Sequence, residues 1–483
     1  MRTDSQASSA TLLTHGQRGT LVQQVRSIIQ ARIVAGGFSS TGRLPSSRQL
    51  AHELGTSRST VVAAYDQLVG EGFVEARERS GLFVNAELLT ADPPAAAPAV
   101  PDWSGRLVRR FTRPLASPPD WDRYPYRFVT GQVDPSLFPT RAWLAHLRRA
   151  LDGPHLSASL DDRGGDDPLL LEALCRTVLP ARGFSARPDE VVVTMGSQHG
   201  LSMLCSLLLR PADLVGMEDP GYPEARHLFR AYGARLRPLP VDAAGVRVEP
   251  GDLADVRLVH VTPSHHHPTN VTTTAARRRL LLGAADRHDT VVVEDDYDSE
   301  LRYRGRPIPA LSAAEDADRC VYLGSFSKLL APGLRLGFMV GSPDLIAAVR
   351  DMQRMTTRQV PGQLQRALAS FLATDDYYRA VRRVHRVLKR RWELLTDAVH
   401  RHLDVADHNF PPGGTSLWLR SAGADWTNLP TAAARHGVAL TPQSEFYAHQ
   451  RGPIRHLRLG FTATPADRIE PGVRALAAAA ASL

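Results

Sequence analysis

GSFSKLLAPGLRLGF, residues 324–338, decides the fold of this 483-residue chain, because it begins where the apolar run CVYLGS (320–325) ends. Four similar apolar runs precede it, separated by helical patterns, at 190–194, 213–218, 256–262 and 290–295. Unalternating apolar strands between helices predict an α/β domain with a mainly parallel sheet covered on both faces. Such sheets bind ligands at the carboxyl ends of their strands, and Lys328 lies at such an end.

Lysine is scarce in this chain. Its 58 basic residues include only Lys328 and Lys389, and the others are arginines. A lysine after a strand is ordinarily a solvated surface residue, but an amine retained beside Ser325, Ser327 and Arg335 indicates chemistry instead. The amine can form a Schiff base with the aldehyde of pyridoxal phosphate, while the two hydroxyls and the guanidinium hold its phosphate. Lys389 lies in the basic run RRVHRVLKRR, where a solvated face is the better interpretation.

The segment EDDYDSE (294–300) supplies a second part of the candidate site. Asp295 can keep a pyridine nitrogen protonated, so that the cofactor ring acts as an electron sink, and Tyr297 can donate to the ring's phenolic oxygen. Clustered carboxylates also suit Mg²⁺. No Walker-type phosphate motif accompanies them, so we predict no metal site.

Three further segments carry candidate ligand contacts. Ser197 and Gln198 open a helix directly after a strand, where backbone N–H groups favour an anion. Tyr222 can stack on the cofactor ring, although a core tyrosine is an equal alternative. Arg458 can clamp a carboxylate with two hydrogen bonds, although an arginine on a late strand is more often a surface charge.

The N-terminal part has the pattern of a winged helix-turn-helix. Three short helical segments precede two strand-like segments joined by a tight turn, and the third helix begins Ser57-Arg58-Ser59-Thr60. Arg43 and Arg48 flank the second helix and supply positive charge for phosphates. The alternative is a small docking module with a solvated arginine face.

The segment LPSSRQLAHELGTSRSTVVAAYDQLVGEGFVE (44–75) is similar to the DNA-binding domain of the GntR superfamily. The resemblance implies that operator DNA is a partner and that the contacting residues are Arg43, Ser46, Arg48, Ser57, Arg58, Thr60 and Gly81. Ser40-Thr41 replaces a common Pro-Gly, and Leu82 replaces a usual threonine in the wing.

The motifs of the larger part, in their order, resemble a fold-type I aminotransferase and more narrowly the large domain of MocR/GabR-type regulators. They include FVTGQVDPSLFP, MEDPGYPEAR, EDDYDSELRYRGRPIPAL and the opening stretch. The resemblance implies a Schiff-base role for Lys328 and cofactor contacts from Ser197, Gln198, Asp295, Tyr297, Ser325, Ser327 and Arg335. It likewise implies that Arg458 binds an effector carboxylate.

One stretch departs from that family. Where relatives commonly read SHQFPTG, residues 264–270 read SHHHPTN. Three consecutive histidines do not present three ligands to one ion at a strand end. We interpret His265, His266 and His267 as an altered pocket wall, so the effector cannot be borrowed from a relative.

The predicted organisation is a winged domain at 1–87, a Pro/Ala-rich linker at 88–122 and an aminotransferase-like domain at 123–483. The formal charge of +8 is compatible with nucleic acid. The sequence has no signal peptide, no membrane-length apolar run and no paired cysteine motif, which predicts a soluble cytoplasmic protein outside the secreted and membrane classes.

The combination predicts a transcriptional regulator that senses an amino compound, or pyridoxal phosphate itself, at Lys328. The resemblance implies a head-to-tail homodimer. An alternative is a working aminotransferase with an autoregulatory DNA-binding domain, although the enzyme interpretation is the less favoured one. A third is a DNA-binding protein whose large domain is only a dimerisation scaffold.

Overall fold

A computed structural model describes the chain at 19–35, 37–38, 42–78, 80–85, 87, 103–108, 110, 118–153, 165–407, 410–411, 413–444, 446–449 and 452–483. The chain divides into two compact units, Met1–Val108 and Arg109–Leu483, and each is described by itself. Most of the linker predicted at 88–122 lies outside the described residues. The two predicted boundaries, after residue 87 and after residue 122, therefore stay predictions.

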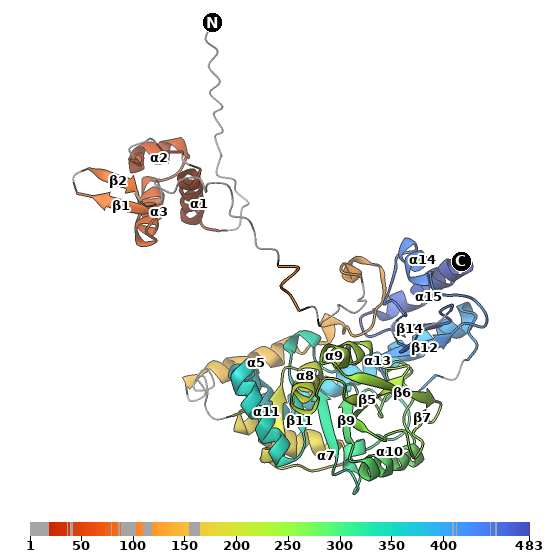
Figure 1. Ribbon diagram of the computed structural model, residues 1–483. Helices are drawn as coiled ribbons and strands as arrows, with labels where there is room; N and C mark the ends of the chain where they lie inside the picture. The colour runs from red at the N-terminus through yellow and green to blue at the C-terminus, as the bar shows by residue number, and fades with distance from the viewer. Residues whose placement is uncertain are drawn as a thin grey trace. The chain divides into compact units, whose positions relative to one another are not determined.

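The small unit is the winged helix-turn-helix that the sequence predicts. It contains α1 (Leu21–Val34), α2 (Ser47–Glu53), α3 (Arg58–Gly70), β1 (Val74–Arg77) and β2 (Gly81–Val84) (Figure 1). Hydroxyl caps start all three helices. The Thr20 side chain accepts from the Gln23 N–H, Ser46 accepts from the Gln49 N–H and Ser57 accepts from the Thr60 N–H. The two strands pair antiparallel as the wing. Its core is built from Val25, Ile29, Leu50, Val61, Ala64, Tyr65, Leu68 and Val84.

The large unit alternates strands and helices through most of its length. Its helices are α5 (Thr140–Leu151), α6 (Pro168–Ala173), α7 (Leu179–Ala181), α8 (Ser197–Leu208), α9 (Pro223–Ala231), α10 (Ala275–His288), α11 (Pro343–Thr356), α12 (Gly362–Leu372), α13 (Asp375–His402), α14 (Leu429–Arg435) and α15 (Ala466–Ala481). Its strands are β3 (Tyr126–Phe128), β4 (Val191–Thr194), β5 (Leu214–Asp219), β6 (Arg235–Asp242), β7 (Gly245–Val246), β8 (Val256–Val261), β9 (Val291–Asp296), β10 (Cys320–Ser325), β11 (Gly337–Val340), β12 (Ser416–Arg420), β13 (Val438–Leu440) and β14 (His456–Gly460).

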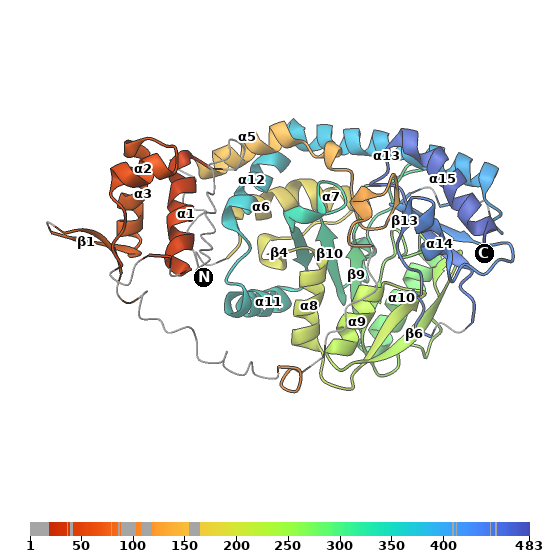
Figure 2. The same ribbon diagram turned by 90° about the horizontal axis from the view of Figure 1, so that it is seen from above.

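Among the described residues, eight strands form the main sheet in the order β4-β11-β10-β9-β8-β5-β6-β7. Strands β10, β9, β8, β5 and β6 run parallel, whereas β11 and β7 run antiparallel to their neighbours. Both faces are covered by helices (Figure 2). In β4, for example, Val191 and Val193 pack into one core cluster and Val192 into another. This double burial explains the unalternating apolar runs.

A smaller C-terminal region completes the large unit and reaches back to its first strand. Strand β12 pairs with β14, and β13 runs parallel to β3 with Val438 opposite Tyr126. The pairing of β13 with β3 fixes the end of β3 and therefore the position of the segment that follows Phe128. No helix in the described ranges is both long and apolar enough to span a bilayer.

The core of the small unit gives a stability prediction. Leu68 of α3 is 0 % exposed, whereas its neighbour Val69 is 37 % exposed. Leu68→Ala is expected to lower the unfolding free energy of the small unit by about 2–5 kcal/mol, because it removes buried methyl groups and leaves a cavity. Amide hydrogen exchange of the α1–α3 peptides in the full chain measures that loss.

Val69→Ala is the matched control and should change the same exchange by less than about 0.5 kcal/mol. Equal effects of the two substitutions would contradict the packing described for α3.

Candidate functional site

The ten residues predicted to bind the cofactor or the effector all line one pocket of about 210 Å³ at the carboxyl ends of the strands. They are Ser197, Gln198, Tyr222, Asp295, Tyr297, Ser325, Ser327, Lys328, Arg335 and Arg458. The pocket joins segments up to 328 positions apart in the chain, from Thr130 to Arg458. Their roles stay predictions, but their convergence is a property of the fold.

Lys328 projects into this pocket from the turn after β10. Its Nζ donates to the Gly131 carbonyl at 2.9 Å. Burial, together with the nearby positive charge of Arg458, lowers the pKa of the Lys328 amine to about 8. An amine with this pKa is partly uncharged near neutral pH, which is the form that attacks a carbonyl carbon.

Asp295 and Tyr297 enter the pocket at the end of β9, the strand next to β10. The parallel register sets Asp295 opposite Leu323, which lies five residues before Lys328. Asp295 is 5 % exposed, and its Oδ2 lies 3.5 Å from Nε2 of the buried His260. Among the described residues, Asp295 Oδ1 and the Tyr297 hydroxyl have no hydrogen-bond partner. Burial raises the pKa of Tyr297 well above its usual value, so its hydroxyl stays protonated.

The other end of the pocket is suited to an anion. Gly196 caps α8 with φ +86°, and a Cβ there would lie 3.3 Å from Arg335 Nη2. Arg335 donates from Nη2 to the Met195 carbonyl at 2.7 Å, which fixes the guanidinium beside the start of α8. The Ser327 N–H donates to Ser325 Oγ at 3.2 Å. A guanidinium, two hydroxyls and a helix N-terminus thus share one end of the pocket.

Arg458 forms the opposite wall and is already engaged by two side chains. Its Nε donates to Ser416 Oγ at 2.9 Å and its Nη1 donates to His267 Nε2. An imidazole that accepts this bond is neutral, and burial together with Arg458 holds the pKa of His267 well below its usual value. A two-point clamp on a carboxylate would therefore require Nη1 to exchange His267 for the ligand.

The three consecutive histidines point to different partners, and only His267 lines the pocket. His265 Nδ1 lies 2.8 Å from Asp298 Oδ1. His266 contacts Thr269 Oγ1 at 2.7 Å and the Pro220 carbonyl at 3.0 Å, and burial lowers its pKa to about 3. Across the described chain, no group of three or more His, Cys, Asp or Glu residues is arranged to hold a metal ion.

Sequence reasoning missed several residues that line the pocket: Thr130, Gly131, Pro223, Glu224, Thr262, Thr415, Thr441, Pro442 and Phe446. Thr130 and Gly131 lie in the segment FVTGQVDPSLFP, which already resembled the family and could have identified them. Thr441, Pro442 and Phe446 reach the pocket through the pairing of β13 with β3, and no local motif announces them.

In the small unit, the predicted DNA contacts fall on the second and third helices and the wing. Arg43, Arg48 and Arg58 are exposed. Arg58 Nε donates to Ser47 Oγ at 3.3 Å. Two other predicted contacts, Ser46 and Ser57, are helix caps, and the Thr60 N–H donates to Ser57 Oγ. The last, Gly81, lies in the wing with φ +107°.

Comparison with known proteins finds the same two units. The family model "Aminotransferase class I and II" matches residues 132–476, and "Bacterial regulatory proteins, gntR family" matches residues 21–84. The HTH-type transcriptional regulator TauR of Rhodobacter capsulatus is 38 % identical over 97 % of this chain and 98 % of its own. The probable rhizopine catabolism regulatory protein MocR of Rhizobium meliloti is 32 % identical over 95 % and 93 %.

The solved structures confirm the fold of the large unit. The crystal structure of Pyrococcus horikoshii kynurenine aminotransferase superposes with a TM-score of 0.69 at 28 % identity and covers 74 % of this chain and 90 % of its own.

The lowered pKa of Lys328 gives a labelling prediction. Because the chain has only two lysines, acetylation by acetic anhydride followed by peptide mass spectrometry separates Lys328 from the internal reference Lys389. Acetylation of Lys328 in the apoprotein is expected to rise with a midpoint near pH 8. Arg458→Met should move that midpoint upward, because it removes a positive charge that disfavours the protonated amine.

A Lys328 midpoint near the ordinary value of 10.5, unchanged by Arg458→Met, would show that the amine is neither buried nor close to Arg458.

Proposed function

Because this chain belongs to the MocR-type transcriptional regulators, which join a GntR-family DNA-binding unit to an aminotransferase class I and II domain, we propose that it binds pyridoxal phosphate at Lys328. The effector that the large unit senses at this site is an amino compound or pyridoxal phosphate itself. The observation that carries the proposal is one pocket in which a buried amine of lowered pKa, a buried carboxylate and an anion-binding end meet.

Unpartnered buried atoms support the fit of the cofactor. Gln198 Oε1, Asp295 Oδ1, the Tyr297 hydroxyl and Ser327 Oγ are all buried, all line the pocket, and find no partner in the described part of the chain. Buried polar groups are normally hydrogen-bonded. A ligand with a ring nitrogen, a phenolic oxygen and a phosphate would satisfy acceptors and donors of these kinds.

Pyridoxal phosphate, when bound, supplies an aldehyde that bonds to amines and a ring that withdraws electrons. The chain's own residues prepare that chemistry. Lys328 offers an amine that is partly uncharged near neutral pH, and Asp295 holds a proton on the ring nitrogen. Arg335, Ser325 and Ser327 bind the phosphate and fix the ring's orientation.

Recognition of the effector falls to the wall opposite the phosphate end. Arg458 binds the acidic group of an amino compound, and Tyr222 packs against the ring. The aldehyde that pyridoxal phosphate would supply could bond to an effector amine in place of Lys328, and the Lys328 Nζ would then be free to hold a proton. The charge of one buried side chain therefore changes when the signal binds.

Transmission to DNA requires two states of the assembly with different affinities for the signal. We infer a head-to-tail homodimer in which the winged domain (1–87), tethered by the linker (88–122), is repositioned on operator DNA by the effector domain (123–483). The residues of the winged domain that contact DNA are Arg43, Ser46, Arg48, Ser57, Arg58, Thr60 and Gly81.

The proposed covalent site gives a spectroscopic prediction. Wild-type protein mixed with pyridoxal phosphate should gain visible absorbance, and borohydride should fix a cofactor mass on the peptide that contains Lys328. Lys328→Ala should lose both signals, whereas Lys389→Ala should keep both. Fixation at Lys389 or at the N-terminus, or absorbance that survives in Lys328→Ala, would overturn the cofactor assignment and favour a dimerisation scaffold.

The similarity to kynurenine aminotransferase supports a second candidate, a working aminotransferase that regulates its own gene. The two candidates differ in turnover. A regulator should form keto acid from a panel of amino acids at less than one equivalent per site, since sensing needs only amine exchange at Lys328. Sustained release of keto acid at roughly 1 s⁻¹ or faster, the rate scale of ordinary enzymes, would instead establish the enzyme.

A further inference from the structure

Helix α13 carries basic side chains along its exposed face, which we call the arginine stripe: Arg379, Arg382, Arg383, Arg386, Lys389 and Arg390. The arginines among them are exposed and Lys389 is half-buried. Successive members are one or three residues apart, and at 100° per residue these positions fall within about 120° of the helix surface over about 16 Å of its axis. The opposite face of α13 is buried through Ala380, Val384, Leu388 and Trp392.

Beyond Arg379, the members of the arginine stripe have no acidic partners among the described residues, unlike an ordinary solvated helix face. Between Tyr377 and Trp392 the helix contains no Asp or Glu. Five stripe residues form no ion pair with any residue that the structure describes: Arg382, Arg383, Arg386, Lys389 and Arg390. Of these, Arg383 donates to the Ser136 carbonyl at 3.1 Å. By contrast, Asp375 and Asp376 pair with Arg379 at 3.6 and 3.2 Å at the start of the helix.

This spacing of like charges works against the helix itself. Arg382 stands four residues before Arg386, which stands four before Arg390, so the neighbours repel each other along the surface. A face that only needs solubility mixes both signs of charge. An arginine face without interspersed acidic residues is suited to binding an external polyanion.

We propose that the arginine stripe binds the phosphate backbone of duplex DNA that flanks the segment contacted by the winged unit. Duplex DNA carries one negative charge per about 1.7 Å, so a stripe of this length faces several phosphates. Guanidinium groups bind phosphate oxygens through two parallel hydrogen bonds, which favours arginine over lysine here. DNA is the polyanion that a GntR-family unit in the same chain already binds. The proposal rests on that DNA-binding unit and is independent of pyridoxal phosphate.

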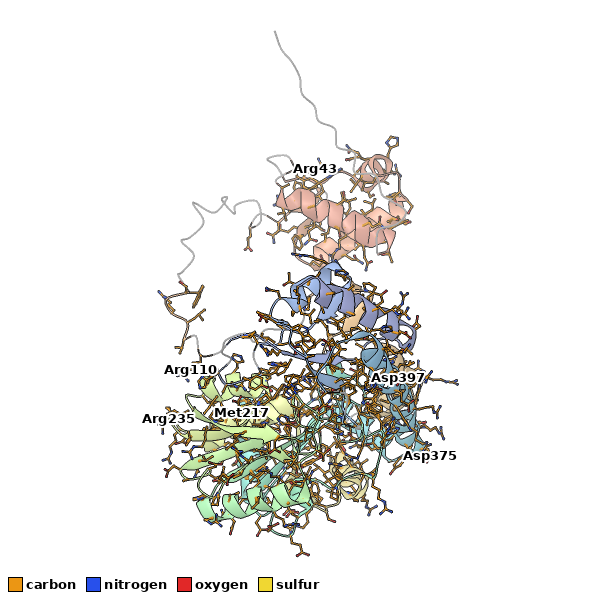
Figure 3. The ribbon with its side chains drawn as sticks, turned by 90° about the vertical axis from the view of Figure 1, so that its right-hand side faces the viewer. Arg43, Arg110, Met217, Arg235, Asp375 and Asp397 are labelled. Carbon is orange, nitrogen blue, oxygen red and sulfur yellow. The ribbon has the colours of Figure 1, made fainter. Side chains whose placement is uncertain are left out.

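The test uses the full-length protein and a 60-bp duplex of mixed sequence, because contacts to the phosphate backbone need no operator. The variant is Arg382→Gln, Arg386→Gln and Arg390→Gln combined. The control removes the same charge elsewhere, through Arg235→Gln, Arg279→Gln and Arg287→Gln, all exposed residues of the large unit. Figure 3 shows Asp375 and Asp397 of α13 on one side of that unit and Arg235 on the other.

The measured quantities are the dissociation constant at about 100 mM salt and the slope of log K against log salt concentration. Loss of three phosphate contacts should reduce the magnitude of the slope by about 2–3 and weaken binding about tenfold or more, with the control near wild type. The stripe variant should also unfold at no lower temperature than wild type, since it relieves repulsion between like charges.

Equal slopes for the stripe and control variants would overturn the proposal, and so would an unchanged DNA slope accompanied by lost binding to phosphatidylglycerol vesicles. A drop in the unfolding temperature that is confined to the stripe variant would also overturn it, because it would assign these arginines to the stability of α13.

Discussion

The structure depends on withdrawing one primary amine from water. Lys328 is held at the carboxyl end of β10, where burial and the charge of Arg458 make its protonated form less favourable. The parallel pairing of β9 with β10 brings Asp295 to the same end of the sheet, and the antiparallel β11 lies between β10 and β4. The sheet thus fixes an amine, a carboxylate and the N-terminus of α8 in one pocket.

Much of this arrangement could be predicted from the sequence, because its signals are local. Buried parallel strands appear in the sequence as unbroken valine-rich runs, and pocket residues lie at or just beyond their carboxyl ends. Asp295 ends the run 290–295, and Lys328 lies three residues after the run 320–325. The contacts that escaped prediction are not local. Gly131 meets Lys328 across 197 positions, and Thr441 meets Thr130 across 311, through strand pairings that only the folded chain reveals.

The histidine triplet illustrates the same limit within a single segment. Its sequence indicates an altered wall, but it does not tell which ring faces the pocket. Packing decides this: His265 is directed toward Asp298 and His266 toward Thr269 and Pro220, which leaves His267 to contact Arg458. The neutral His267 therefore accepts a hydrogen bond from Arg458 in the pocket, a contact that no motif encodes.

The central claim is that one event at Lys328 is both sensed and reported to DNA. The most direct measurement titrates wild-type holoprotein with an amine that alters its visible spectrum, and records absorbance and affinity for a promoter fragment in the same samples. Coincident half-saturation of the two signals is the predicted result. A spectral change that leaves DNA affinity constant across the whole titration would contradict the claim.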